Sequence, residues 1–384
     1  MNFKFGIEHE VAFLNSNGQF ADFANTSFDA FEAIVKRLPH YEQDYPQLRV
    51  GDAGIKLKRW YVEGFERFAE TGEVVDCPPK GIEIRTTVHN SIEGAVSELK
   101  ESFQLLSVEA ERVGFVPALV SFHPFRTEFV PVPPLNQFET MRRKESPEMQ
   151  TAHIPMLTQG PDINLSAQGL SPTQLIDIGQ KLTYYSPFII PFSYSAPFYR
   201  GEAWTGLSVR TFYRTGARPA AMVFLEHASD LIDSTPSLTQ IARIPAEVGR
   251  IEFKAFDSCG DFDLYASLSA LLKGLVLDQT LIGRRLVPDR ELHQKSAQFG
   301  FADDEIYTAA QTALTAAKQS LLQAGDLLNC SLLKRLERRL QQRTSPAQQM
   351  LEAYRKGTPI PEVLTQAYVQ SKQTQSKQTQ YSLA

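Results

Sequence analysis

The sequence has few cysteines, no long apolar run and no basic excess. Its 384 residues include only three cysteines, an odd number without paired spacing, so neither a disulfide framework nor a zinc site is supported. Such usage is typical of the reducing cytoplasm, and no charged-then-apolar leader stands at the start of the chain. The longest uncharged stretch, residues 182–199, is interrupted by prolines and favours a buried helix and turn over a membrane span. We therefore expect a cytoplasmic protein without a membrane partner.

Two further absences narrow the function. The net charge of -5 gives no basic footprint for phosphate backbones, which argues against nucleic acid as the main partner. No GxGxxG motif follows a candidate strand and no Walker A motif (GxxxxGKS/T) occurs, so a Rossmann or P-loop nucleotide site has no local support. Apolar residues make up 42% of the chain, which is ordinary and predicts a core of normal size.

The most informative segment is a strand-like run, residues 3–14, which carries two carboxylates in apolar surroundings. Glu8 and Glu10 are two residues apart, and in a strand such residues point to the same face. Two acids on one face are costly unless positive charge meets them. The alternatives are a salt bridge at a sheet edge and a bound divalent cation. His9 lies between the two acids, so we expect it to face the core on the opposite side.

Four later segments repeat this pattern of polar groups at every second position with apolar residues between them. Because the five segments favour Glu, Asp, Asn and Arg, they predict an antiparallel sheet whose second face lines a polar cavity. The alternative is a sheet with one face in water. The four segments are 81–88 with Glu83 and Arg85, 162–166 with Asp162, Asn164 and Ser166, 206–212 with Ser208 and Arg210, and 249–256 with Arg250, Glu252 and Lys254.

Helical periodicity separates these strands. It predicts helices at 27–38 and 91–113, one beginning at Ser171-Pro172, a helical stretch at 262–286 and an amphipathic region at 303–343 broken near Gly325. Residues 116–122 are typical of a further strand, and the proline-rich residues 126–161 of a long loop, which often carries function. The order is not a strict βαβ alternation. The expected fold is therefore α+β, an antiparallel sheet with helices packed on its outer face.

Five segments are more specific in their order and spacing than any one of them alone. They are Gly6-Ile7-Glu8-His9-Glu10, Gly81-Ile82-Glu83-Ile84-Arg85-Thr86, Ser195–Gly201, Trp204–Thr211 and Arg250–Asp257. Together they resemble the motifs of the glutamate–cysteine ligase type 2 family of carboxylate–amine ligases, relatives of glutamine synthetase, from Gly6 to about Val276. The chain departs from the family where Asp162-Ile163-Asn164 replaces His-Val-His and where Lys254 replaces an arginine. The resemblance implies a funnel of about six antiparallel strands, with ATP at one end, metals in the middle and the amino acid at the other.

The reaction that this resemblance implies is ATP-dependent amide formation through an acyl phosphate, most specifically the joining of glutamate to cysteine in glutathione biosynthesis. Magnesium, with manganese as an alternative, needs hard oxygen ligands, for which we expect Glu8, Glu10, Glu83, Glu252 and Asp162. Arginine forks suit phosphoryl groups and carboxylates; we expect Arg210 and Arg214 at the phosphoryl group and Arg85, Arg200 and Arg250 at the substrate carboxylates. His123 is a candidate substrate contact, and Lys254 and Asn164 are candidate nucleotide contacts.

Each role has a structural alternative. Glu252 could form a cross-strand salt bridge with Arg85 or Arg210. Arg214 and Arg218 could be solvated surface residues, and His123 a structural histidine. Two other functions also stay open. One is a phosphagen-type kinase acting on a guanidino group, for which Cys259 is the single, weak reactive-cysteine candidate. The other is a non-catalytic homologue that binds ATP.

We expect three parts in the chain: a catalytic ligase domain in residues 1–290, a helical segment packed on it in residues 291–370, and a disordered polar tail in residues 371–384, which contains a short repeat. The helices at 303–343 could pack on the sheet or form a homodimer interface, and periodicity does not choose between these. The expected partners are ATP and small amino acids, with a second copy of the chain if those helices dimerise.

Overall fold

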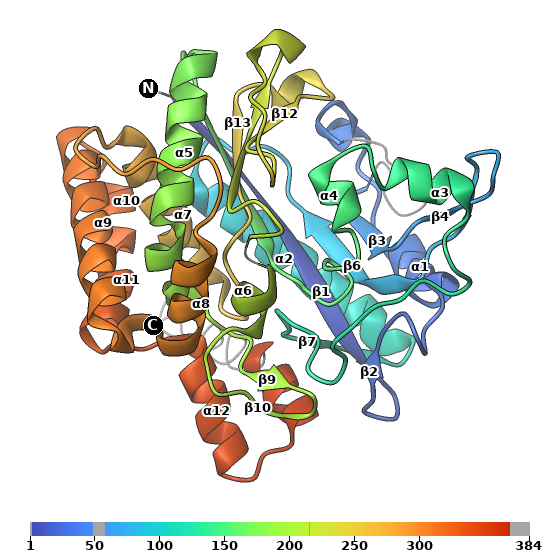
Figure 1. Cartoon of the computed structure of the whole chain (residues 1–384). Coiled ribbons are helices and arrows are strands. Elements are labelled where there is room, and N and C mark those ends of the chain that lie inside the picture. Colours follow the sequence, from blue (N-terminus) through green and yellow to red (C-terminus); the bar gives the residue numbers. More distant parts are fainter. Residues whose placement is uncertain (1, 49–57, 215, 369–384) are drawn as a thin grey trace.

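The computed structural model describes residues 2–48, 58–214 and 216–368. Its centre is a mixed sheet in which seven strands follow the order β12-β11-β13-β8-β1-β6-β3, with β2 and β7 also paired to β1 (Figure 1). The polar segment 371–384 lies outside the described residues. The strands of this sheet are β1 (Phe3–Asn15), β2 (Phe20–Ala21), β3 (Trp60–Gly64), β6 (Pro79–Arg85), β7 (Phe115–Ala118), β8 (Pro161–Ala167), β11 (Ala221–Leu225), β12 (Thr239–Ile241) and β13 (Arg250–Phe253). Two small ladders join β4 (Arg67–Phe68) to β5 (Val74–Asp76) and β9 (Phe198–Tyr199) to β10 (Glu202–Ala203).

Strand β1 separates an apolar face from a polar one. Phe5, Ile7 and Val11 are buried in the core, whereas Glu8 and Glu10 alternate with them on the other face. This period of two is what the sequence predicts for residues 3–14. His9 is also in the core, fully buried, and its ring nitrogens lie 2.8 Å from the hydroxyls of Tyr265 and Tyr368. Its expected core position is confirmed.

Helices cover the apolar face of the sheet in two layers (Figure 1). Helices α1 (Phe28–Arg37), α2 (Ile92–Arg112), α5 (Pro172–Ile189) and α7 (Phe262–Leu277) contact the strands directly. Ser27, Ser91 and Ser171 cap α1, α2 and α5, each accepting a hydrogen bond from a first-turn backbone N–H. Helices α9 (Asp304–Gln323), α10 (Leu327–Leu332) and α11 (Lys334–Gln341) pack against α7 in a second layer. The remaining helices are α3 (Gln137–Arg142), α4 (Pro147–Gln150), α6 (Val209–Arg214), α8 (Arg290–Phe299) and α12 (Pro346–Arg355), and residues 360–368 are also helical.

Two parts of the predicted fold need correction. The sheet is mixed rather than purely antiparallel and larger than six strands, because β12 returns beside β11 in the parallel direction, with Val223 opposite Thr239. The predicted strand at 206–212 is wrong. Its second half is helix α6, whose first turn is held by the Ser208 hydroxyl accepting from the Thr211 N–H at 3.0 Å. The helix α8 packs against it, so tertiary contacts override the alternating pattern.

Smaller differences concern element lengths. The helix expected over 262–286 ends at Leu277, the strand expected over 116–122 is β7 (Phe115–Ala118), and the loop expected over 126–161 contains the short helices α3 and α4. Among the described residues, no helix combines the length and apolar character needed to cross a bilayer.

Candidate functional site

The polar face of the sheet borders a cavity of about 1190 Å³. Strands β1, β6, β8 and β13 supply one side of its lining. Further lining comes from β3, from residues 142–160 around α4, from the arginines in and after α6, and from residues 240–250. The sequence predicted that this polar face lines a cavity rather than lying open to water, and the structure has such a cavity.

Strand register brings the predicted acids together on this face. Glu10 lies opposite Glu83 of β6, and Glu8 lies opposite Asp162 of β8. Glu252 of β13 lies opposite Asn164 of β8. Directly opposed side chains in antiparallel strands are neighbours, with Cβ atoms about 5 Å apart. Four strands that are distant in sequence therefore place their acids on one surface.

The first cluster, here termed the Glu8 group, consists of Glu8, Asp162 and Glu252, whose carboxylate oxygens lie within 4.8 Å of one another. Lys254 forms ion pairs with Asp162 and, at 2.9 Å, with Glu252. Burial raises the pKa of Asp162 to about 7 despite the attraction of Lys254. For Lys254, burial alone would lower the pKa, but the charges of Asp162 and Glu252 outweigh it and raise the value.

Arg250 supplies a second cation to the Glu8 group. Its Nη1 lies 3.4 Å from Glu8 Oε1 and 3.4 Å from Glu252 Oε1, and its guanidinium stacks 3.9 Å above the centre of the Phe224 ring. Asn164 Nδ2 also donates to Glu8 Oε1 at 3.2 Å. Glu252 thus forms salt bridges, as the sequence alternative predicted, but with Arg250 and Lys254 of its own segment.

The second cluster, here termed the Glu10 group, consists of Glu10, Glu63 and Glu83, again within 4.8 Å of one another. Lys80 Nζ lies 2.8 Å from Glu10 Oε1 and 3.1 Å from Glu63 Oε2. Burial, and then the charge of Glu10, raise the pKa of Glu63 to about 8. Burial and the neighbouring acids raise the pKa of Glu83 well above its usual range. Three carboxylates this close favour protonation or a bound cation.

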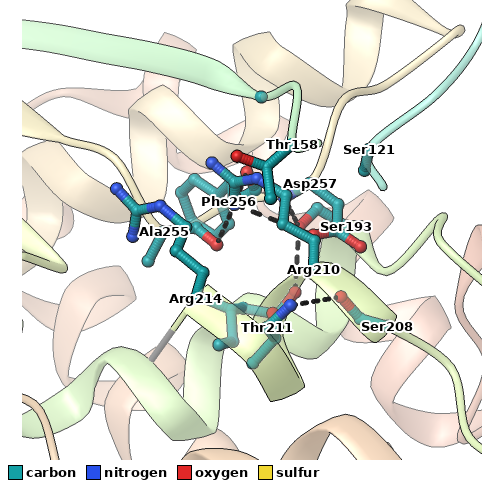
Figure 2. Close-up of polar contacts among 12 residues, drawn as sticks. Ser121, Thr158, Ser193, Ser208, Arg210, Thr211, Arg214, Ala255, Phe256 and Asp257 are labelled. Atoms are coloured by element: carbon teal, nitrogen blue, oxygen red, sulfur yellow. Dashed lines mark hydrogen bonds and ion pairs between the residues drawn. The ribbon is translucent and has the colours of Figure 1, made fainter. Parts of the chain in front are cut away.

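Three arginines at four-residue intervals, Arg210, Arg214 and Arg218, lie beside the carboxylates. Arg210 donates to the backbone carbonyls of Lys254, Ala255 and Phe256 at 2.9, 3.1 and 2.8 Å, near the buried Asp257 (Figure 2). Arg210 is therefore largely committed to holding the end of β13.

Arg214 is less engaged. It is buried, it donates to the Pro219 carbonyl at 2.8 Å, and within the described chain no carboxylate lies within ion-pair distance of it. Burial, followed by the charges of Arg210 and Arg218, lowers the pKa of Arg214 well below its usual range. An anion bound here would relieve that repulsion, so these arginines form an anion-binding arrangement. Because Arg214 is buried, it is not the solvated surface residue of the alternative interpretation.

Most of the predicted site residues line the cavity, but two do not. Arg200 is exposed outside it and lies over the Tyr199 ring. His123 is buried outside it, with Nε2 at 2.9 Å from Asp22 and Nδ1 accepting from the Arg126 N–H at 2.9 Å. These contacts match the structural alternative for His123. The predicted residues that do line the cavity are Glu8, Glu10, Glu83, Arg85, Asp162, Asn164, Arg210, Arg214, Arg250, Glu252 and Lys254.

Three further residues of the cavity lining, Tyr61, Glu63 and Lys80, were not predicted from the sequence. Tyr61 and Glu63 alternate with buried residues in β3, so the period-two pattern of Trp60–Gly64 could have revealed them. Lys80 had no such signal, because by strict alternation it faces away from Glu83. The β3–β6 pairing shifts register at Glu63/Gly64, and this irregularity brings Lys80 to the cavity.

The donor chemistry of these clusters suits a hard divalent cation. Magnesium and manganese prefer carboxylate oxygens. The Glu10 group offers three such ligands around one lysine, and the contact of the buried Glu63 Oε2 with Lys80 Nζ at 3.1 Å is an ion pair without hydrogen-bond geometry. The residues present therefore fit the expected metal at this group.

Among the comparisons with known proteins, the one with solved structures gives matches. No family model and no curated protein matches the chain. Among solved structures, the chain is similar to a bifunctional glutathione synthetase from Pasteurella multocida, with 13% identity, a TM-score of 0.55 and 97% of this chain aligned to 52% of that one. It is also similar to a glutamate–cysteine ligase from Francisella tularensis in complex with AMP, with 11% identity, a TM-score of 0.54 and 97% of this chain aligned to 89% of that one. The chain thus spans about half the length of the first protein. At these identities the likeness concerns the fold alone: the chain shares its fold with these two ligases, in agreement with the fold that its motifs predict.

Proposed function

We propose that the chain is an ATP-dependent carboxylate–amine ligase that forms an amide through an acyl phosphate. The observation that carries the proposal is that two groups of three carboxylates and a row of arginines border a single cavity. Phosphoryl transfer needs little covalent help from a protein and much positioning and charge neutralisation. The cavity offers both, and the shared fold supports the same class of reaction.

The reaction proceeds in two steps. A substrate carboxylate oxygen attacks the γ-phosphorus of ATP, the bond to the ADP oxygen breaks, and an acyl phosphate forms. An amine nitrogen then attacks the acyl carbon, inorganic phosphate leaves, and the nitrogen loses a proton. Arg214 and Arg218 would stabilise the negative oxygens of the transferred group, since both residues line the cavity. Arg210 would hold the end of β13, and with it Lys254, in place.

A magnesium ion, or manganese, would be held by Glu10, Glu63 and Glu83. Glu8, Asp162 and Glu252 form the second acidic cluster of the cavity. When bound, such an ion neutralises charge on the β- and γ-phosphates. Asn164 and Lys254 are proposed nucleotide contacts, and Arg85 and Arg250 proposed contacts for a substrate carboxylate, because all four line the cavity.

We propose glutamate and cysteine as the substrates, in the cytoplasm. The support is the likeness in fold to a glutamate–cysteine ligase. Among the other hypotheses, the guanidino kinase loses its one candidate residue. Cys259 is buried outside the cavity lining, and burial raises the pKa of its thiol far above the usual range, so it is not poised to react.

The test is ADP release from the purified chain with Mg-ATP and glutamate across a panel of amines that includes cysteine. Amine-dependent ADP release with the mass of γ-glutamylcysteine is the expected result. Another amide would keep the ligase and change the amine. A stable phosphorylated small molecule would favour the kinase. Failure of Mg-ATP to raise the melting temperature, together with no turnover, would contradict the proposal and favour a module that has lost nucleotide binding.

A further inference from the structure

The two carboxylate groups differ in the cations that already contact them. In the Glu8 group, three carboxylates meet two cations, Lys254 and Arg250. In the Glu10 group, three carboxylates meet one cation, Lys80. Arg250 also lies 3.4 Å from Glu247 Oε1, so it is shared with a further carboxylate, and Lys254 is the cation that contacts the Glu8 group most closely.

The carboxylates of the two groups also differ in how far their oxygens are occupied. Lys254 contacts Asp162 Oδ2 and Glu252 Oε2, and Arg250 approaches oxygens of Glu8 and Glu252. By contrast, Glu83 is only 5% exposed and, within the described chain, has no lysine or arginine at ion-pair distance. At the Glu8 group a divalent cation would thus compete with Lys254 and Arg250, whereas at the Glu10 group it would compete with Lys80 alone.

The backbone of Lys254 is held in place beside the two acids. Its backbone N–H donates to the Ala220 carbonyl at 2.9 Å, and its own carbonyl accepts from Arg210 Nη2 at 2.9 Å. Both backbone groups are therefore held, and only the side chain can move. That side chain is largely buried between the two acids it contacts.

We infer that Lys254 is a built-in cation of the Glu8 group, whose ammonium excludes the divalent ion that these three carboxylates would otherwise hold. The reason is repulsion: an ion bound to Asp162 and Glu252 would lie next to the ammonium in partly desolvated surroundings, where like charges repel strongly. The inference rests on the proposed function only in taking magnesium or manganese as the relevant ion.

The test counts Mn²⁺ ions bound to the full chain without nucleotide, by titration followed through the electron paramagnetic resonance signal of free Mn²⁺. The variant Lys254→Met removes the ammonium and keeps the stem. It is expected to bind one more Mn²⁺ per chain than the natural protein. Lys254→Arg keeps the charge and is expected to bind the same number as the natural protein. An equal count for Lys254→Met and the natural protein would overturn the inference.

A double variant locates the added ion. Lys254→Met with Glu252→Gln should lose the extra Mn²⁺ and return to the natural count. Retention of the extra ion would mean that it binds elsewhere, which would also overturn the inference.

If Lys254→Met does not fold, single variants in the natural background decide. Glu83→Gln should weaken Mn²⁺ binding by 10-fold or more, whereas Glu252→Gln should leave it within about threefold. Equal losses in both would contradict the inference. Ion counting needs no turnover, so an inactive chain with the expected counts would contradict the ligase proposal and leave this inference standing.

Discussion

Gly160 and Arg210 are in direct contact, and the guanidinium of Arg210 occupies the space where a Cβ at position 160 would lie. The same glycine donates its backbone N–H to Glu10 Oε2 at 2.8 Å. One residue without a side chain thus joins the arginine that holds β13 to an acid of the Glu10 group.

Gly160→Ala should therefore destabilise the protein. The added methyl group would displace Arg210 from the carbonyls of residues 254–256, and overpacking of this kind costs about 1–3 kcal/mol. Urea denaturation of both proteins measures the difference in the free energy of unfolding. Gly6→Ala is the matched control, because a Cβ there would meet Thr86 Oγ1 at 3.7 Å and Asn164 Cβ at 3.8 Å, which is ordinary contact. Equal effects at the two positions would contradict the crowding at Gly160.

Two arginines of the sequence prediction differ in position, which makes them a matched pair. Arg214→Met should lower amine-dependent ADP formation by about 100-fold or more, since removing a preorganised donor to a developing anion costs 10²–10³ in rate. Arg200→Met should leave it within about threefold, because Arg200 is exposed outside the cavity. Steady-state ADP release by both variants checks this. A large loss in Arg200→Met, or none in Arg214→Met, would contradict the placement of the anion-binding arrangement.

The hydroxyl of Tyr368 supports the back of β1. It lies 2.8 Å from Nε2 of the buried His9. Tyr368→Phe would leave that nitrogen without this partner, at a cost of about 1–3 kcal/mol in unfolding free energy. Tyr354→Phe serves as the control, since among the described residues the Tyr354 hydroxyl has no hydrogen bond, and we expect a change below about 0.5 kcal/mol. Chemical denaturation compares them, and a neutral Tyr368→Phe would show that the contact is dispensable.

A buried histidine makes stability depend on pH. His293 Nδ1 donates to the Asp289 carbonyl at 2.6 Å, its Nε2 lies 2.8 Å from Ser186 Oγ, and burial lowers its pKa to about 4. Because the folded pKa lies below the unfolded value of 6.5, the unfolded state binds the extra proton as pH falls from 6.5 towards 4, and stability is lost there. Between pH 7.5 and pH 5, this histidine should cost about 2 kcal/mol.

The comparison with His293→Gln isolates that contribution from other titrating groups. The natural protein should lose about 2 kcal/mol more than the variant over the same pH interval. Unfolding free energies at the two pH values give the answer. A pH dependence that is identical in both proteins would mean that His293 is already protonated in the folded state or titrates alike in both states.

The sequence predicted the acids of the site because strand periodicity is a local property. Alternation at Glu8 and Glu10 determines their shared face, and the same reasoning holds for Glu83 and Glu252. Which strands lie side by side is not local. The pairing of β8 with both β1 and β13, which unites Asp162 with Glu8 and Glu252, depends on the packing of the whole sheet.

The positions that the sequence did not predict also depend on contacts between distant parts of the chain. Ser208 and Arg210 alternate with apolar residues as in a strand, but the contact with α8 and the Ser208 cap make that segment helical. Lys80 reaches the cavity only through an irregularity of β6, and Arg200 leaves it because the β9–β10 hairpin carries it away. Tertiary contacts decided all three positions, and no pattern within ten residues reports them.

Strand β1 has acids on one face and His9 on the other, and it pairs with β2, β6, β7 and β8. Deleting one residue between Phe5 and Glu8 would move the side chains of either the preceding or the following part of the strand to the opposite face of the sheet. Either Glu8 and Glu10 would turn into the aromatic surroundings of His9, or the apolar start of the strand would turn into the cavity. A substitution in β1 changes one side chain, whereas the deletion of a single codon there would move a whole set of side chains to the wrong face of the sheet.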